Sequence, residues 1–179
     1  LFHFADAVRS FGIARDLFNR FQSPYAQTLE KALVQAKEMV DGDVYVAMLE
    51  EAEPLLEIGE QIVIKLPCTT DGIRACNSLS SRGVRTNLTL CFQPLQALMA
   101  AKAGAFLISP FIGRLDDIGQ DGMDLIQQIR TMYDNYGYET QVLAASIRHP
   151  MHLVQCALIG ADVATVPFKV IEGMMKHPL

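Results

Sequence analysis

The chain has 179 residues, 50% of them apolar, and a formal net charge of −5. This size and apolar content suit one well-buried domain, and we expect residues 1–179 to form a single domain. The acidic balance and the lack of a Lys/Arg run argue against a nucleic-acid-binding surface, and no apolar run reaches the ~18 residues of a membrane-spanning helix. The first residues, Leu1-Phe2-His3-Phe4, lack the pattern of a signal peptide, so we expect a cytoplasmic location.

Short apolar runs alternate with amphipathic segments, and the rhythm is regular from residue 43 onward. The predicted strands cover 1–5, 43–47, 61–66, 84–90, 105–109, 141–145 and 161–166. The predicted helices cover 29–40, 48–58, 70–82, 93–103, 120–136, 149–160 and 168–176. Repeated β-α units predict a parallel sheet with helices outside it. Side chains suited to helix N-caps support these helices, such as Thr69 or Thr70 before Asp71 and Asp121 before Met123.

The predicted fold class is α/β, a (β/α)8 TIM barrel with parallel strands and outer helices. The seven predicted strands are one fewer than the barrel needs, and the length lies below its ~200-residue lower range. We interpret this shortfall as N-terminal segments missing from the chain, near residues 6–22 and at the join 47/48. At that join a strand would run into a helix with no loop, although βα loops usually have about two to six residues.

Lys65 is the one charged residue in an otherwise largely apolar stretch, Gln61-Ile62-Val63-Ile64-Lys65-Leu66-Pro67. Such a stretch is typical of a buried parallel strand. Burial lowers the pKa of a lysine, and the neutral amine attacks carbonyl groups, so the pattern favours a Schiff-base lysine. The alternative is a lysine at the strand end that extends to solvent, because Pro67 marks that end.

Polar residues stand late in several predicted strands, on faces that can all be turned inward. Side chains alternate between the two faces of a strand, so residues two apart share a face. The residues that can converge are Lys65, Asn87, Thr89, Ser109, Phe111 and Ser146. Active sites of parallel barrels form at the carboxyl ends of the strands, and the set is therefore a candidate active site.

Arg114 and Arg148 follow two of these strand ends. Together with Ser146 and backbone N–H groups, they could hold a phosphate. The alternative is that they form surface ion pairs with nearby carboxylates: Asp116, Asp117 or Glu139.

The pattern of possible metal ligands is weak. The four cysteines are Cys68, Cys76, Cys91 and Cys156, and none belongs to a C-x-x-C pair. We interpret them as reduced thiols of a cytosolic protein. His149 and His152 are three residues apart, but a metal site needs further ligands. We therefore predict no metal and no cofactor.

Four motifs in order resemble one known family. They are Ile64-Lys65-Leu66-Pro67, Thr86-Asn87-Leu88-Thr89-Leu90, Ser109-Pro110-Phe111-Ile112-Gly113-Arg114-Leu115-Asp116-Asp117-Ile118-Gly119 and Ala145-Ser146-Ile147-Arg148-His149-Pro150. Together they look like transaldolase, and most of all like its small bacterial transaldolase-like and fructose-6-phosphate aldolase group. The resemblance covers about residues 24–179.

The resemblance implies a class I aldolase mechanism on a (β/α)8 barrel without a metal. Lys65 matches the lysine that forms a Schiff base with the ketose C2 carbonyl. Asn87 and Thr89 match residues that bind substrate and position the catalytic water, and Ser109 matches a polar contact in the pocket. Asp6 is assigned to the acid-base Asp at the end of the first strand, although Ala7 stands where the family has Thr.

The same resemblance implies the specificity of the pocket. Arg114, Ser146 and Arg148 match the phosphate site. Phe111 matches the Phe of true transaldolases, whereas the aldolase branch has Tyr there, so it favours transfer over release of dihydroxyacetone. The family's Thr-Thr-Asn-Pro-Ser motif after the second strand is missing. Its acidic or amide residue on the third strand is also missing, because Ala47 runs directly into Met48.

The leading hypothesis is a transaldolase of the pentose phosphate pathway, acting on sedoheptulose 7-phosphate or fructose 6-phosphate and an aldose phosphate. One alternative is a fructose-6-phosphate aldolase, which releases dihydroxyacetone and glyceraldehyde 3-phosphate. Another is a non-catalytic sugar-phosphate-binding barrel. By resemblance we expect a homo-oligomer, a pentamer or decamer, with sugar phosphates as its ligands.

Overall fold

The computed structural model describes residues 44–176. The chain divides into two compact units, residues 1–50 and 51–179, and the sheet lies in the second. The prediction of one domain over residues 1–179 stays a prediction. No helix in the described range is long and apolar enough to cross a membrane.

Five strands form one sheet in the order β1-β2-β3-β4-β5, and every neighbouring pair is parallel. The strands are β1 (Ile64–Pro67), β2 (Thr86–Cys91), β3 (Leu107–Pro110), β4 (Gln141–Ala144) and β5 (Val163–Ala164). The helices are α3 (Val44–Leu56), α4 (Thr70–Ser81), α5 (Pro94–Lys102), α6 (Ile112–Asp116), α7 (Gly122–Tyr136), α8 (Pro150–Ile159) and α9 (Phe168–Met174). Each strand is followed by at least one helix, so the α/β fold class is confirmed.

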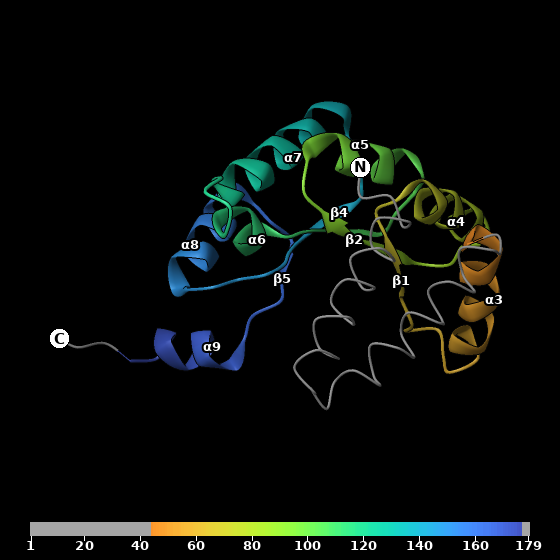
Figure 1. The fold of residues 1–179 in the computed structure, drawn as a ribbon, viewed down its shortest axis with the longest axis horizontal. Coiled ribbons are helices and arrows are strands. Elements are labelled where there is room, and N and C mark those ends of the chain that lie inside the picture. Colours follow the sequence, from red (N-terminus) through yellow and green to blue (C-terminus); the bar gives the residue numbers. More distant parts are fainter. Residues whose placement is uncertain (1–43, 177–179) are drawn as a thin grey trace, which may run out of the picture. The chain divides into compact units, whose positions relative to one another are not determined.

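The sheet keeps chain order, with each strand beside the one before it and the one after it. Consecutive β-α units wind in this way in a (β/α)8 barrel. The described residues supply five parallel strands of such a barrel and no closure of β5 back onto β1. Figure 1 shows α4, α5 and α7 side by side along one face of the sheet.

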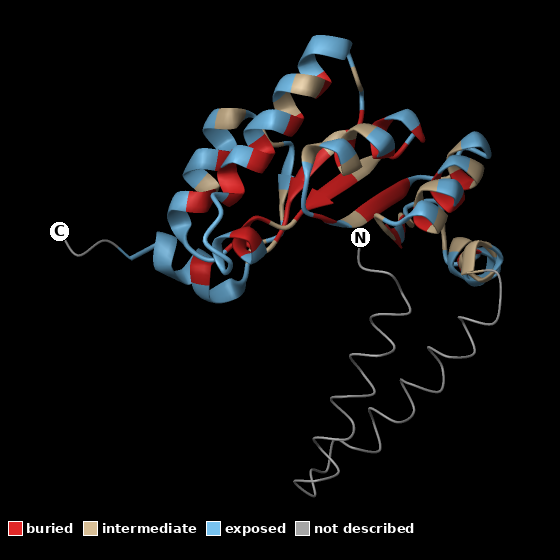
Figure 2. Cartoon of the chain, turned by 45° about the horizontal axis from the view of Figure 1, so that its top comes forward, coloured by how far each residue is buried: buried red, intermediate tan, exposed pale blue. Residues whose placement is uncertain are grey.

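The core lies between the sheet and this layer of helices. Leu88, Ile108 and Val142 of the central strands have no exposed surface, and neither do Ile126 and Ile129 of α7. Figure 2 shows the buried residues along the strands and on the inward sides of the helices. This core makes the strands a rigid support for the side chains at their carboxyl ends.

Two predicted details of the helix ends are confirmed. The hydroxyl of Thr69 accepts a hydrogen bond from Gly72 N at the start of α4, and the carboxylate of Asp121 accepts one from Met123 N at the start of α7. These side chains satisfy backbone donors that have no partner within the helix.

The strand predicted over 43–47 is wrong, because Val44 already belongs to α3. Val44 and Val46 suggested a strand, but the segment Ala47–Leu56 that follows is rich in good helix formers and extends the helix back over them. The join 47/48 is therefore the interior of a helix, and the loop that seemed to be missing there is not needed. The strand predicted at 1–5 and the helix predicted at 29–40 lie outside the described residues.

Candidate functional site

A cavity of about 350 Å³ lies within the unit of residues 51–179. Its lining comes from strands β1 to β4 and from the segments that follow β3, β4 and β5: Lys65, Asn87, Ser109, Phe111, Arg114, Leu143, Ala145, Ser146, Ile147, Arg148, Thr165 and Pro167. Seven of the nine predicted site residues are in this set. Of the other two, Thr89 is not among the lining residues, and Asp6 lies outside the described residues.

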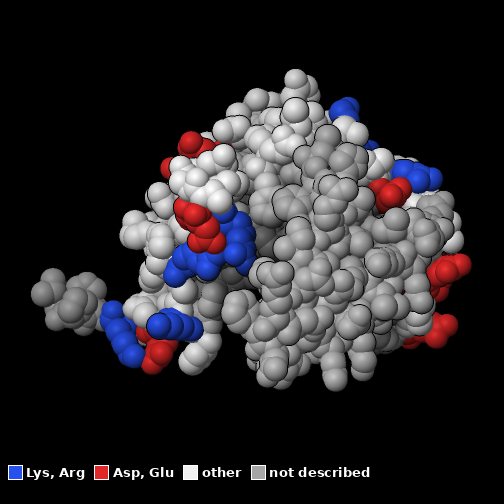
Figure 3. All heavy atoms as spheres, viewed as in Figure 1, with Lys and Arg blue, Asp and Glu red and all other residues white. Residues whose placement is uncertain are grey.

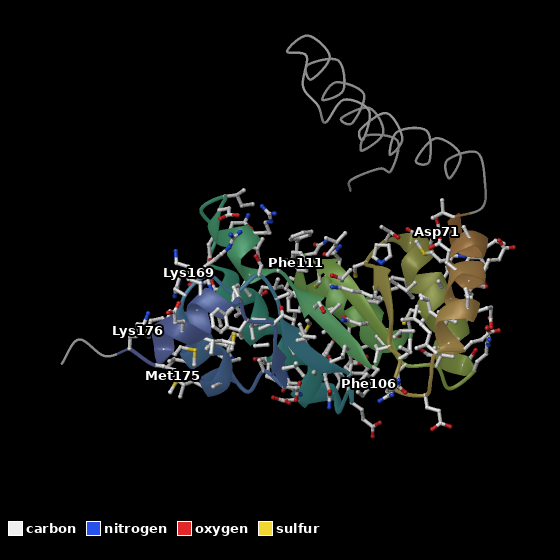
Figure 4. The ribbon with its side chains drawn as sticks, turned by 90° about the horizontal axis from the view of Figure 1, so that it is seen from below. Asp71, Phe106, Phe111, Lys169, Met175 and Lys176 are labelled. Carbon is white, nitrogen blue, oxygen red and sulfur yellow. The ribbon has the colours of Figure 1, made fainter. Side chains whose placement is uncertain are left out.

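The cavity lies where parallel strands place functional groups. Phe106 comes just before β3 and Phe111 just after it. Figure 4 shows the two side chains at opposite ends of the strands, and Phe111 lines the cavity. The ring of Phe111 also makes an edge-to-face contact with Phe92, with ring centroids 5.8 Å apart, which restricts its orientation.

Lys65 is exposed, so of the two interpretations of its side chain, burial is wrong and extension to solvent is confirmed. Strand β1 is buried on the face of Ile64 and Leu66 only, whereas Lys65 lies on the opposite face and lines the cavity. The apolar run reflected one buried face and did not show that the second was open. Lys65 pairs in register with Asn87 on β2, which brings the amine and the amide onto neighbouring strands.

Asn87 and Ser109 form a buried polar pair at the base of the cavity. The hydroxyl of Ser109 donates a hydrogen bond of 2.7 Å to Oδ1 of Asn87, and both residues are buried. The bond occupies the amide oxygen, so the amide N–H groups of Asn87 are the donors that a ligand can use. The predicted convergence of these two residues is confirmed.

Thr89 lies beside a β-bulge. Thr89 and Leu90 together oppose Ser109, because Leu88 pairs with Ile108 and Cys91 with Pro110. Leu90 has a φ of 61°, which is rare for a residue with a side chain. Among the described residues, Oγ1 of Thr89 is buried without a hydrogen-bond partner. Such an atom costs about 1–3 kcal/mol, which favours a bound water or ligand as its partner.

Ser146 has a φ of 64°, so the chain turns sharply just after β4. Helix α6 holds this turn, because Ile112 N donates to Ala145 O at 3.0 Å and Gly113 N donates to Ser146 O at 3.2 Å. A Cβ on Gly113 would overlap Ser146 O and the side chain of Arg148. The glycine therefore allows α6 to approach the turn closely.

Arg114 and Arg148 both line the cavity and both contact Asp117. The shorter contact joins Arg148 Nη2 to Asp117 Oδ2 at 2.7 Å, and Arg114 Nη1 lies 3.6 Å from the same oxygen. Figure 3 shows Lys and Arg atoms gathered on one part of this face, with Asp and Glu atoms directly beside them. The two interpretations of the arginines are thus compatible, since one carboxylate orients two guanidinium groups that remain exposed to a ligand.

The pattern reasoning missed two polar residues that the structure places at or near the cavity. Thr165 follows β5 and lines the cavity, and its position at a strand end was a signal that could have identified it. His152 is buried behind Arg148 and hydrogen-bonds to Asp116, which no sequence pattern indicates. Among residues 44–176, no three or more His, Cys, Asp or Glu side chains could hold a metal ion together.

The sequence matches the family model described as Transaldolase/Fructose-6-phosphate aldolase over residues 27–179. A probable transaldolase of Flavobacterium psychrophilum is 57% identical over 83% of this chain and 72% of its own length. Probable transaldolases of Geotalea uraniireducens and Hydrogenobaculum sp. are 58% and 56% identical over 74% of this chain. These two matches cover 62% and 61% of the relatives, so the chain spans about three fifths of their length.

Proposed function

The chain belongs to the transaldolase/fructose-6-phosphate aldolase family, and we propose that it is a transaldolase. It would transfer a dihydroxyacetone unit from a ketose phosphate to an aldose phosphate through a Schiff base on Lys65. The observation that carries the proposal is that one cavity is lined by a lysine and by two arginines that follow other strands. A lysine amine can form the covalent intermediate, and guanidinium groups suit the phosphate of a sugar phosphate.

In the proposed reaction the Lys65 amine attacks the C2 carbonyl of the ketose, and loss of water gives an iminium ion. The C3–C4 bond then breaks as the proton of the C4 hydroxyl leaves, which releases an aldose. The bonding electrons pass to the iminium nitrogen and form an enamine. The enamine adds to the carbonyl of a second aldose, and hydrolysis frees Lys65 and the new ketose.

The predicted polar site residues have separate roles in this proposal. Asn87, held by Ser109, donates to a substrate hydroxyl, and the unpartnered hydroxyl of Thr89 binds the water used in the proton transfers. Asp6 acts on the substrate hydroxyl. Arg114, Ser146 and Arg148 bind the phosphate.

Phe111 supports transfer over simple release. Its side chain lines the cavity and carries no hydroxyl that could protonate the enamine. The enamine would then persist until an acceptor aldehyde arrives. The proposed donors are sedoheptulose 7-phosphate and fructose 6-phosphate, which places the enzyme in the pentose phosphate pathway of the cytoplasm. A homo-oligomer is proposed from the family alone.

Borohydride trapping with fructose 6-phosphate, followed by peptide mass mapping, tests the proposal. We expect a dihydroxyacetone-sized adduct on Lys65, none in Lys65→Arg, and an unchanged adduct in Lys102→Met, which removes a lysine at the end of α5. No adduct in the folded full chain would reject the Schiff-base mechanism. Release of free dihydroxyacetone without an acceptor would instead identify a fructose-6-phosphate aldolase.

A further inference from the structure

The imidazole of His152 joins two parts of the cavity wall. His152 lies on α8 and is only 4% exposed. Its Nδ1 accepts a hydrogen bond from the backbone N–H of Arg148 at 3.2 Å. Its Nε2 lies 3.0 Å from Oδ2 of Asp116, the last residue of α6. This pairing is complete only for a neutral ring with its hydrogen on Nε2, because Nδ1 must be an acceptor.

Asp116, the last residue of α6, and Asp117, the C-cap residue that follows it, each fix a different part of Arg148. Asp116 is itself fixed, because its Oδ1 accepts a hydrogen bond from Gly122 N at 2.9 Å while Oδ2 faces His152. Asp117 binds the guanidinium of Arg148 directly. One carboxylate therefore positions the backbone of Arg148 through His152, and its neighbour positions the charged end of the side chain.

The turn at residues 145–148 needs such support. Ser146 has a positive φ, a conformation that a serine adopts only when the surroundings favour it. Ser146 and Arg148 lie on either side of Ile147 and both line the cavity. A shift of the Arg148 backbone would therefore displace two of the three side chains proposed for phosphate binding.

We propose that His152 is a positioning residue for phosphate binding, which as a neutral imidazole ties the backbone of Arg148 to Asp116. This inference rests on the proposed phosphate site of Arg114, Ser146 and Arg148. It predicts that His152 affects the binding of phosphorylated ligands and does not affect the chemistry at Lys65, which belongs to a different strand.

The inference also predicts an effect of pH. Burial and the neighbouring His149 lower the pKa of His152, whereas Asp116 and, more weakly, Asp121 oppose this shift. The other charged groups nearby are Arg148 and its partner Asp117. Protonation of Nδ1 would place two N–H donors opposite each other at Arg148 N. Anion binding should therefore weaken as the pH falls through this lowered pKa, which lies below the ordinary histidine value of about 6.5.

Two near-isosteric variants separate the two bonds of the ring. His152→Gln can keep a donor near Asp116 and loses the acceptor for Arg148, whereas His152→Asn can keep that acceptor and loses the donor. For His152→Gln we expect KM for fructose 6-phosphate and Kd of inorganic phosphate to rise about five- to tenfold, with kcat nearly unchanged. His152→Asn should recover part of this loss. His149→Gln, which changes the exposed neighbouring ring, is the matched control.

Dihydroxyacetone, which has no phosphate, separates binding from chemistry. Its borohydride trapping on Lys65 should proceed at the wild-type rate in His152→Gln. Unchanged phosphate Kd and KM in this variant would overturn the inference. Arg148→Ala tests the underlying site: if it too leaves phosphate binding unchanged, the proposed phosphate site itself is wrong, whereas weakening in Arg148→Ala alone overturns only the role of His152.

Sulfate binding to the wild-type protein covers the case in which the His152 variants do not fold. Sulfate keeps its charge over the pH range of interest, so its affinity reports on the protein. We expect the affinity to fall severalfold as the pH falls through the lowered pKa of His152, in His149→Gln as well as in wild type. An affinity that does not change with pH, or a change that disappears in His149→Gln, would contradict the inference.

Discussion

Lys65 has an exposed side chain on a strand that is buried on its other face, so its proposed role in catalysis can be tested separately from stability. Lys65→Arg keeps the positive charge and removes the primary amine. We expect loss of activity by at least about 10³-fold, because the covalent path is closed. The melting temperature should stay close to that of wild type, because exposed substitutions usually change the free energy of unfolding by less than about 0.5 kcal/mol. Lys102→Met is the control in both assays.

Ser109 should contribute mainly to stability, because the residue is only 1% exposed and its hydroxyl donates a hydrogen bond to Asn87. Ser109→Ala leaves the buried Oδ1 of Asn87 without this donor. We expect the free energy of unfolding to fall by about 1–3 kcal/mol, measured by urea denaturation. Ser81→Ala removes an exposed hydroxyl that donates to Ser78 O and should have a much smaller effect. Equal effects of the two substitutions would show that the buried Ser109–Asn87 hydrogen bond contributes no more to the free energy of unfolding than an exposed one.

The free energy of unfolding should also depend on pH through His152. Its pKa is lowered in the folded protein, so between that pKa and about 6.5 the unfolded chain binds more protons. Stability is therefore highest above this range and decreases as the pH falls through it. Urea denaturation at pH 7.5 and 5.5 should show a smaller decrease in His152→Gln than in wild type or in His149→Gln. An equal decrease in all three would assign the pH effect to other groups.

At the scale of elements, α6 controls the turn that follows β4. Gly113→Ala introduces a Cβ that would overlap Ser146 O and Arg148, and two backbone hydrogen bonds must lengthen to make room. We expect a loss of about 1–3 kcal/mol in the free energy of unfolding and a raised KM for fructose 6-phosphate. Gly173→Ala in α9 is the matched control, because its Cβ would meet nothing within 4 Å. It should be neutral or slightly stabilising.

Helices α6 and α3 show what sequence patterns can and cannot predict. The order of β1 to β4 and their helices was predicted because the spacing of apolar residues indicates which positions are buried. The polar residues late in the predicted strands then identified most of the residues that line the cavity. Helix α6 was missed because its five residues have no side-chain cap and are held by the turn after β4, a tertiary contact. Helix α3 was mistaken in part for a strand, because two valines outweighed the helix formers after them.

The bulge in β2 marks a second limit of pattern reasoning. The alternation of side chains along each strand predicted that Asn87 and Ser109 share one face of the sheet, and their hydrogen bond confirms it. The same alternation predicted that Thr89 shares this face. It could not show that Leu90 adopts a positive φ or that Thr89 does not line the cavity. The contacts of His152 could not be predicted for a similar reason, because its hydrogen-bond partners lie on α6 and in the turn before α8.

At the scale of the whole molecule, the net charge and the local charge of the cavity have opposite signs. The chain carries a formal charge of −5, whereas Lys65, Arg114 and Arg148 line the cavity with Asp117 beside them. Long-range repulsion of a phosphate acts over many ångströms and is screened at ~0.1 M salt, where the Debye length is about 10 Å. Contact with the guanidinium groups acts at a few ångströms and is screened less, but added anions compete for it directly.

These two effects lead to opposite predictions for salt. If the local contacts dominate, KM for fructose 6-phosphate should rise about two- to fivefold between roughly 0.05 and 0.5 M NaCl, as chloride competes for the arginines. If the net charge dominates, KM should fall. We expect the rise, because the proposed phosphate site would bring the substrate into contact with Arg114 and Arg148, which line the cavity. Trapping of dihydroxyacetone on Lys65 is the control, since a ligand without phosphate should show little dependence on salt; a KM that falls with salt would reject the arginine-based site.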